Sequence, residues 1–255
     1  MYLSKLLINI NGTLENFVYK SKLMTRYVSI KPLINFKIYS AKPINLQLGK
    51  ETLLMVLLNN IQPGEVVYDI GANIGLYSLA ISSFQLGNVV YAFEPNPETF
   101  TKLKANLSLN QTATNIVPLQ IAIGNTDSEC DFMISSQHER SSFYMFGASF
   151  GNASVKKIVK VNVEKLDSLI EQLLPPQHIK IDAEGSEANI LEGARQTIQK
   201  HKPTLYIEPH STEQEEKVCQ FLKSIDYGIE KNSGCYICKP LCKPLVPSQV
   251  LVIAK

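Results

Sequence analysis

Carboxylates and one histidine stand at the ends of apolar runs in this chain of 255 residues, a placement that suits a binding or catalytic site. Asp69 and Glu94 each lie at the end of a short apolar run, and Asp182, Glu184 and His210 end or follow two later ones. Because the carboxyl ends of parallel strands meet along one edge of a sheet, we expect these groups to converge there. Such a set can accept hydrogen bonds from a ligand or take a proton from one of its hydroxyls.

A turn with two glycines follows the first of these runs, which covers residues 66–70. Gly71 and Gly75 give the backbone freedom, and without a Cβ they let a ligand approach closely. Asn73, between them, is the kind of non-glycine residue that best tolerates left-handed torsions. An amphipathic helix begins after Gly75, so its free N–H groups would face a ligand above the strand. This strand–turn–helix predicts a cofactor site, although an ordinary connection would look the same when taken alone.

A nucleotide-like ligand also requires an acid about twenty residues further on, to bind its ribose hydroxyls. Glu94 fills that place, nineteen residues after Gly75. Both a nicotinamide dinucleotide and S-adenosylmethionine bind in this way. The dinucleotide needs a third glycine beneath its pyrophosphate, where this chain has Leu76 or Tyr77. S-adenosylmethionine has no pyrophosphate and is therefore the better fit.

Strand and helix patterns alternate from residue 66 onward, which predicts an α/β fold with a mostly parallel sheet and right-handed crossovers. The strands are expected at 66–70, 89–93, 116–124, 179–182 and 204–207, with two late strands at 225–230 and 249–254. The end of the third strand, at Ala122, should lie near the adenine end of a cofactor held by Glu94. Two β-like runs, 130–134 and 157–163, break the alternation and predict an inserted hairpin with a long loop.

Residues 1–60 carry no strong motif, and basic side chains are interleaved there with apolar ones. We expect an N-terminal helical segment packed on a main domain of residues 61–255. Two alternative interpretations of this segment are a lid over the pocket for the acceptor, which is the molecule that would receive a methyl group from S-adenosylmethionine, and a weak contact with a membrane surface.

The composition is that of an ordinary soluble protein, with 45% hydrophobic and 19% charged residues. The net charge of +2 gives no argument for nucleic acid as a partner. No apolar window is long enough for an integral membrane segment, and no signal peptide is recognisable. We therefore expect a cytoplasmic protein. The sequence carries no signal for an oligomeric state.

Metal binding is considered at two places. Cys235, Cys238 and Cys242 form a tight group, but no fourth ligand lies nearby, and the first two fit a strand equally well. The oxygen-rich set around Asp182 and Glu184 also suits magnesium or calcium. Nothing in the spacing requires a divalent metal, so the sequence assigns no metal ligand.

Four segments carry recognisable motifs: Asp69-Ile-Gly-Ala-Asn-Ile-Gly75 with Tyr77-Ser78, Phe93-Glu-Pro-Asn-Pro97, Ile179-Lys-Ile-Asp-Ala-Glu-Gly-Ser-Glu187 and Ile207-Glu-Pro-His210. Together these segments resemble the FkbM-type branch of the S-adenosylmethionine-dependent methyltransferases. They occur in the order of the family, and the combination is specific. The family usually has valine where Ala183 stands and often alanine at Ser186, both mild departures.

The resemblance implies a Rossmann-like class I methyltransferase fold: a seven-stranded, mostly parallel sheet with its last strand antiparallel and helices on both faces. It also implies O-methylation of a hydroxyl on a small molecule or glycan, such as a sugar, a glycolipid or polysaccharide unit, or a polyketide. The implied contacts with the methionine part of the cofactor come from Asp69, Gly71, Asn73 and Gly75. Glu94 would bind the ribose, and Asp182 with its neighbours would face the acceptor.

A sulfonium is already a good leaving group, so the protein mainly has to align the acceptor and exclude water. A base would help a hydroxyl acceptor, and the catalytic candidates are Asp182, Glu184 and His210, which can titrate near neutral pH. A structural role for each is the alternative. Two other functions also remain open: an NAD-dependent oxidoreductase, disfavoured by the missing glycine and the lack of a Tyr-x-x-x-Lys pair, and a non-catalytic cofactor-binding partner subunit.

Overall fold

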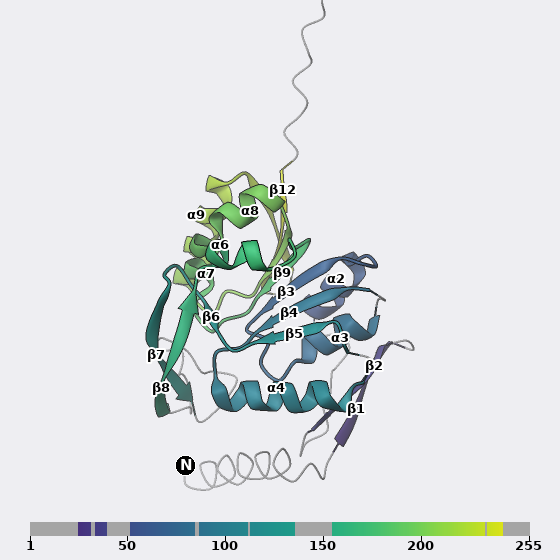
Figure 1. Ribbon diagram of the computed structural model, residues 1–255. Helices are drawn as coiled ribbons and strands as arrows, with labels where there is room; N and C mark the ends of the chain where they lie inside the picture. The colour runs from purple at the N-terminus through teal and green to yellow at the C-terminus, as the bar shows by residue number, and fades with distance from the viewer. Residues whose placement is uncertain are drawn as a thin grey trace, which may run out of the picture.

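A seven-stranded sheet forms the centre of the protein in a computed structural model that describes residues 25–31, 34–39, 52–84, 87–111, 113–135, 155–232 and 234–241 (Figure 1). In spatial order its strands are β11 (Tyr227–Asn232), β12 (Cys235–Pro240), β10 (Thr204–Ile207), β9 (His178–Ile181), β3 (Val66–Ile70), β4 (Val89–Phe93) and β5 (Ile116–Leu119). Only β12 runs antiparallel to its neighbours. The predicted mostly parallel sheet with an antiparallel strand is confirmed.

The direction in which the chain adds strands reverses at β3. From β3 the chain moves outward to β4 and β5, and it returns to pair β9 on the other side of β3. All five residues of β3 are buried, as expected for a parallel strand covered on both faces. In open α/β sheets, ligands bind at the carboxyl ends of the strands at such a reversal.

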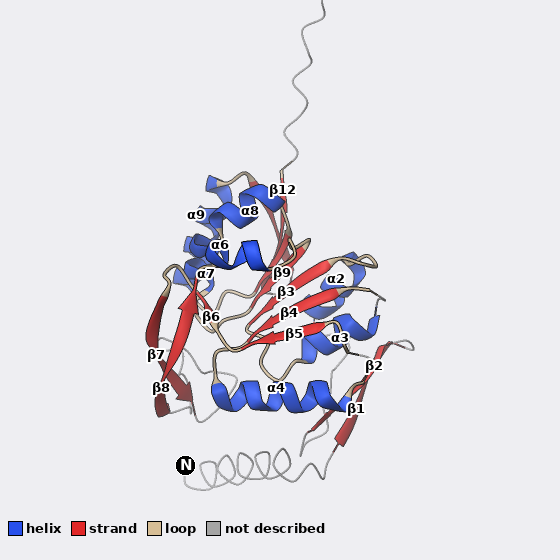
Figure 2. Cartoon of the chain, viewed as in Figure 1, coloured by secondary structure: helices blue, strands red, loops and turns tan. Residues whose placement is uncertain are grey.

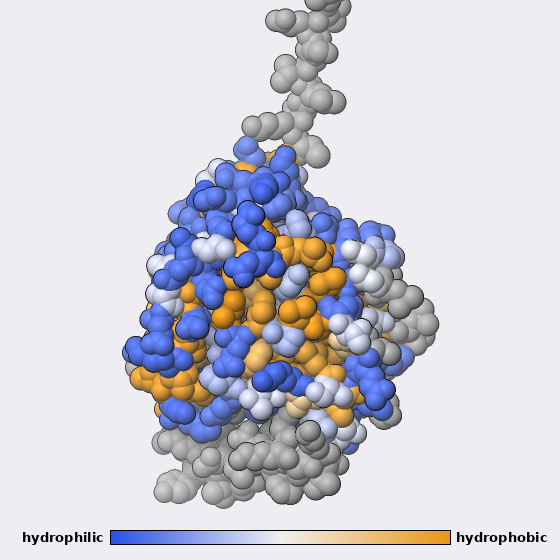
Figure 3. Space-filling model, viewed as in Figure 1, coloured by the Kyte–Doolittle hydropathy of each residue, from blue (hydrophilic) through white to orange (hydrophobic). Residues whose placement is uncertain are grey.

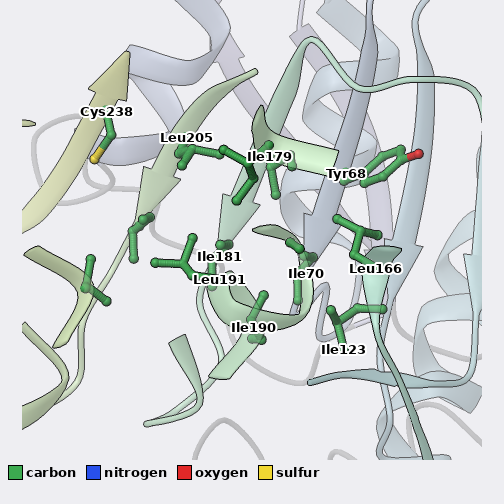
Figure 4. Close-up of a cluster of buried hydrophobic side chains, with 14 of the residues drawn as sticks. Tyr68, Ile70, Ile123, Leu166, Ile179, Ile181, Ile190, Leu191, Leu205 and Cys238 are labelled. Atoms are coloured by element: carbon green, nitrogen blue, oxygen red, sulfur yellow. The ribbon is translucent and has the colours of Figure 1, made fainter. Parts of the chain in front are cut away.

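Helices cover both faces of the sheet (Figure 2). One face carries α2 (Thr52–Asn60), α3 (Leu76–Phe84) and α4 (Pro97–Leu109), and the other carries α6 (Leu166–Leu169), α7 (Glu187–Gly193), α8 (Arg195–His201) and α9 (Thr212–Ser224). Successive side chains of β3 enter opposite cores: Val67 packs in the first, and Tyr68 and Ile70 pack in the second. Figure 4 shows Tyr68 and Ile70 among side chains of α6 and α7.

The described part of residues 1–60, which is 25–31, 34–39 and 52–60, is only partly helical, and the rest of the segment lies outside the described residues. Helix α2 agrees with the helical prediction, but β1 (Thr25–Lys31) and β2 (Ile34–Tyr39) form an antiparallel hairpin. Ile34, Phe36 and Ile38 are buried in the same core as α3 and α4. Their alternation with Asn35 and Lys37 has the period of two that is typical of a strand, and the mixture of basic and apolar residues obscured it.

The predicted third strand is in fact two. β5 ends at Leu119, and β6 (Ala122–Ile123) leaves the central sheet to pair with β8 (Val155–Glu164). The strand β7 (Ser128–Ser135) pairs antiparallel with β8, which confirms the inserted hairpin. Its connecting loop and the strand predicted at 249–254 lie outside the described residues.

The edge strand β5 lies on the face of the molecule that Figure 3 shows. Apolar side chains gather in the middle of this face and polar side chains surround them. Val117 of this edge strand is 39% exposed. None of the helices in the described part of the chain is long and apolar enough to cross a membrane.

Candidate active site

The glycine turn after β3 has the predicted backbone. Gly71, Asn73 and Gly75 have φ angles of 77°, 51° and 89°, all in the left-handed region. The N–H groups of Gly71 and Ala72 both donate to the carbonyl oxygen of Phe93, at 3.0 and 2.9 Å. The turn is therefore fastened to the end of β4, next to Glu94.

The two glycines are required for a reason that the sequence did not reveal. A Cβ on Gly71 would lie 1.8 Å from the carbonyl oxygen of Asp182, and one on Gly75 would lie 2.5 Å from Cδ1 of Leu103 in α4. The protein itself fills the space that we expected a ligand to use. Contact of these glycines with a cofactor stays a prediction, and what the structure shows is that Gly71 brings the loop after β9 against the turn.

Asp69 lies beneath the turn and is completely buried. Its Oδ2 accepts a hydrogen bond from Ser78 Oγ at 2.6 Å, and its Oδ1 pairs with the ammonium of Lys180 at 3.1 Å. Its carboxylate faces the interior and contacts Ser78 and Lys180. The predicted role of Asp69 in holding the methionine part of a cofactor would therefore be indirect, through the positions of these two residues.

Lys180, in the middle of β9, is the residue of this site that sequence reasoning missed. It is 2% exposed, donates to the carbonyl oxygen of Gly71 at 2.9 Å, and lies 3.6 Å from Oδ2 of Asp182. Burial would lower the pKa of Lys180, but Asp69 and Asp182 outweigh it and raise the pKa, so the ammonium stays charged. A lysine in a central parallel strand has no path to water and needs carboxylate partners, and this was the available signal.

Glu94 directly follows β4 and is 7% exposed. Its Oε2 accepts the N–H of Asn73 at 2.9 Å, and its Oε1 accepts the N–H of Asn96 at 2.8 Å. Burial, only partly offset by these two donors, raises the pKa of Glu94 to about 7. Each oxygen of an ionised carboxylate can accept a further hydrogen bond, so the predicted contact with two ribose hydroxyls is chemically compatible with this arrangement.

Ala122 is buried in β6, where it pairs with Val163. The residue of this region that contacts Glu94 is Leu119, at the end of β5, whose carbonyl oxygen accepts the N–H of Glu94 at 3.1 Å. A contact between Ala122 and the adenine end of a cofactor stays a prediction.

Asp182, Glu184 and His210 lie together at the ends of β9 and β10, as predicted from the order of the strands. The Nε2 atom of His210 is 3.5 Å from Oδ1 of Asp182 and 3.7 Å from Oε1 of Glu184. Their side chains are 31%, 24% and 25% exposed for Asp182, Glu184 and His210, so all three can meet a ligand. Glu184 also has a positive φ of 48°, which is uncommon for a residue with a side chain.

Glu187 supports His210 from its other side. Its Oε1 lies 3.0 Å from Nδ1 of His210 and also accepts the N–H groups of Ala183 and Gly185. Burial works against protonation of His210, but Glu187, Asp182 and Glu184 outweigh it and raise its pKa to about 9. The expectation that His210 titrates near neutral pH is therefore not met, and as an imidazolium it is no proton acceptor.

Asn106 of α4 joins the N-terminal hairpin to the glycine turn. It is fully buried, its Oδ1 accepts the N–H of Tyr39 at 2.9 Å, and its Nδ2 donates to the carbonyl oxygen of Ile74 at 2.8 Å. The hairpin therefore rests on the helices that support the turn. The interpretation of residues 1–60 as a lid stays a prediction.

Comparison with protein families gives a match of residues 69–229 to the methyltransferase FkbM domain. Hexuronic acid methyltransferase AglP of Haloferax volcanii is 27% identical over 153 residues, which is 59% of each chain. The 31-O-demethyl-FK506 methyltransferase FkbM of Streptomyces tacrolimicus is 41% identical over 56 residues, 22% of each chain. The matched part of the chain thus spans about three fifths of the first relative and about a fifth of the second.

Among solved structures, the methyltransferase FkbM from Methylobacillus flagellatus KT has a TM-score of 0.50 to this protein at 22% identity. The match covers 71% of this chain and 44% of that chain. At this identity the similarity concerns the fold, and it agrees with the Rossmann-like sheet described above.

Proposed function

This chain belongs to the FkbM methyltransferase family, and from that premise we propose that it transfers a methyl group from S-adenosylmethionine to a hydroxyl oxygen of a small molecule or glycan. The observation that carries the proposal is that the glycine turn packs against the loop after β9, because a Cβ on Gly71 would lie 1.8 Å from the carbonyl oxygen of Asp182. We propose that the glycine turn with Glu94 binds the cofactor and that the set around Asp182 binds the acceptor. This contact would place the two sites side by side.

The residues of the turn fit S-adenosylmethionine better than NAD. Glu94 offers a desolvated carboxylate to ribose hydroxyls, which both ligands have. The place of the third glycine is occupied, since Leu76 packs against the core and the ring of Tyr77 lies 5.0 Å from Nζ of Lys180. A pyrophosphate needs that place empty, and S-adenosylmethionine has none.

When bound, S-adenosylmethionine would supply a methyl group on a good leaving group. The chain's own task would be to align the acceptor hydroxyl and accept its proton as the new C–O bond forms. Asp182 suits this task because its side chain is 31% exposed, with Oδ2 3.6 Å from Nζ of Lys180 and Oδ1 3.5 Å from Nε2 of His210. His210, charged at neutral pH, would fix the carboxylates and would not act as the base.

The names of the two relatives support the acceptor class. One acts on a hexuronic acid, and the other acts on an FK506 derivative that lacks a methyl group on an oxygen. Both descriptions are of hydroxyl-bearing molecules, which agrees with an acceptor site lined by carboxylates that can accept hydrogen bonds from hydroxyl groups.

Thermal unfolding with S-adenosylhomocysteine, and separately with NAD, tests the proposal. A ligand at about 100 times its dissociation constant stabilises the folded state by about 2.7 kcal/mol, which for a chain of this size raises Tm by about 5–11 °C. We expect this rise with S-adenosylhomocysteine and none with NAD. A rise with NAD alone would overturn the proposal, and cofactor binding without methyl transfer to any hydroxyl acceptor would favour a non-catalytic subunit.

A further inference from the structure

Asp182, Glu184 and His210 have the geometry of an incomplete coordination shell. One potential ligand atom from each lies within 4.8 Å of the others. The distances from Nε2 of His210 to the two carboxylates, 3.5 and 3.7 Å, are longer than the roughly 2.7–3.2 Å of a good hydrogen bond. Donor atoms about 2.1–2.3 Å from one cation, at right angles, would stand about 3.0–3.3 Å apart. Small side-chain movements would therefore close this group around a cation.

The charges around the group favour a cation. Three carboxylates, those of Asp182, Glu184 and Glu187, surround the single imidazole of His210. Lys180, on the neighbouring side of Asp182, is already paired with the buried Asp69 at 3.1 Å. The group therefore has a surplus of negative charge even when His210 is protonated, and a cation at Nε2 would neutralise it in place of that proton.

Glu187 provides an independent indication. It is completely buried, and its Oε2 has no hydrogen-bond partner among the described residues. Its other oxygen lies 3.0 Å from Nδ1 of His210. In metal sites the ligating histidine usually donates its second ring N–H to such a carboxylate, which fixes the tautomer and directs the first nitrogen at the metal. A buried carboxylate oxygen without a hydrogen-bond donor is unfavourable, and a cation beside this group would offset part of that cost.

We propose that Asp182, Glu184 and His210 bind a divalent cation, with Glu187 orienting His210. Two carboxylates and one imidazole form a mixed ligand set, which suits Mn²⁺ better than the all-oxygen preference of Ca²⁺. Three protein ligands leave further positions for water and for an acceptor. In a role that rests on the proposed function, the cation would bind the acceptor oxygen and lower the pKa of its hydroxyl. Asp182 would then act as a ligand of the cation in place of its role as the base, and the hydroxyl proton would pass to water.

Titration with Mn²⁺, followed by electron paramagnetic resonance of the unbound ion, tests the site directly. The full chain would be treated with a chelator, freed of it, and measured at pH 8. The variants are Glu184→Gln and His210→Gln, and the matched control is Glu192→Gln, a carboxylate nearby in sequence that pairs with Arg195 on the surface. We expect the wild type and the control to bind Mn²⁺ equally, and the two variants to bind at least about 10-fold more weakly.

The thermal shift with S-adenosylhomocysteine, measured on the same samples, shows whether each variant is folded and separates this proposal from the proposed function. Mn²⁺ binding that is absent in the wild type, or unchanged in both variants, overturns the metal site. Mn²⁺ binding that depends on Glu184 and His210 supports it, even if S-adenosylhomocysteine gives no shift and the methyltransferase proposal fails.

Discussion

Glu94 is the residue whose chemistry is most changed by its surroundings. Burial raises the pKa of Glu94 to about 7, although two backbone N–H donors lower it. Of the two charged groups that face Glu94, Lys180 lowers this pKa and Asp69 raises it. The folded chain thus holds a proton that the unfolded chain releases above about pH 4.5. The resulting contribution to stability is present at low pH and is lost as the pH rises through 7.

Cofactor affinity should show the opposite trend. Ribose hydroxyls donate to an ionised carboxylate, so the affinity for S-adenosylhomocysteine should rise between pH 6 and pH 8, by up to about 10-fold per pH unit below the pKa of Glu94. Calorimetric titration at several pH values measures this. Glu94→Gln should flatten both trends, whereas Glu98→Gln, an exposed carboxylate at the start of α4, should keep them. An unchanged slope in Glu94→Gln would assign the effect to another group.

At this scale the sequence predicted where the candidate residues lie but not which groups they contact. The convergence of Asp182, Glu184 and His210 was predictable, because each lies at or just after the end of a recognisable strand. Their roles, and that of Glu94, stay predictions. The pairing of Lys180 with Asp69 depends on β3 and β9 being neighbours in a fixed register, with Asp69 opposite Lys180. No local pattern contains that information.

Among the contacts between secondary-structure elements, the contact of the glycine turn with the loop after β9 can be tested most sharply. Gly71→Ala would add a Cβ to a residue whose backbone is in the left-handed region. That Cβ would lie 1.8 Å from the carbonyl oxygen of Asp182. Backbone strain and overlap together should lower the free energy of unfolding by about 2–5 kcal/mol. Urea denaturation measures the change.

Gly64→Ala is the matched control. Gly64 has a φ of 84°, close to that of Gly71, but a Cβ there would meet no atom within 4 Å. This variant should suffer the backbone strain alone, about 1 kcal/mol. Equal losses in the two variants would show that the loop after β9 yields to the added methyl group and that Gly71 does not set its position.

Buried parallel strands were predictable as elements because their apolar runs are continuous. The hairpin of β1 and β2 was not, since the basic residues Arg26, Lys31 and Lys37 interrupt its apolar ones. The side chains of β2 are buried in a core that they share with α3 and α4. The break between β5 and β6 was hidden for a related reason. Both halves are apolar, and only the pairing of β6 with β8 separates them.

The described residues form two large cores, one on each side of the central sheet, and a small apolar cluster in the hairpin of β7 and β8. The described N-terminal elements contribute to one of the two large cores. β2 and α2 share a core with α3 and α4. Asn106 adds a polar link from this hairpin to the glycine turn. The boundary at residues 60 and 61 stays a prediction about folding, and this packing leads us to expect that residues 25–60 unfold together with the rest.

Alanine variants in the shared core test that expectation. Phe36 of β2, Leu57 of α2 and Leu79 of α3 are at most 2% exposed. If they belong to one cooperative unit, each substitution by alanine should lower stability by about 2–5 kcal/mol and shift a single calorimetric transition downward. S-adenosylhomocysteine should raise that same transition in every variant. Two transitions, with the ligand-sensitive one unmoved by Phe36→Ala and Leu57→Ala, would instead establish a separate N-terminal unit, because cavities in an independent domain leave its neighbour's stability unchanged.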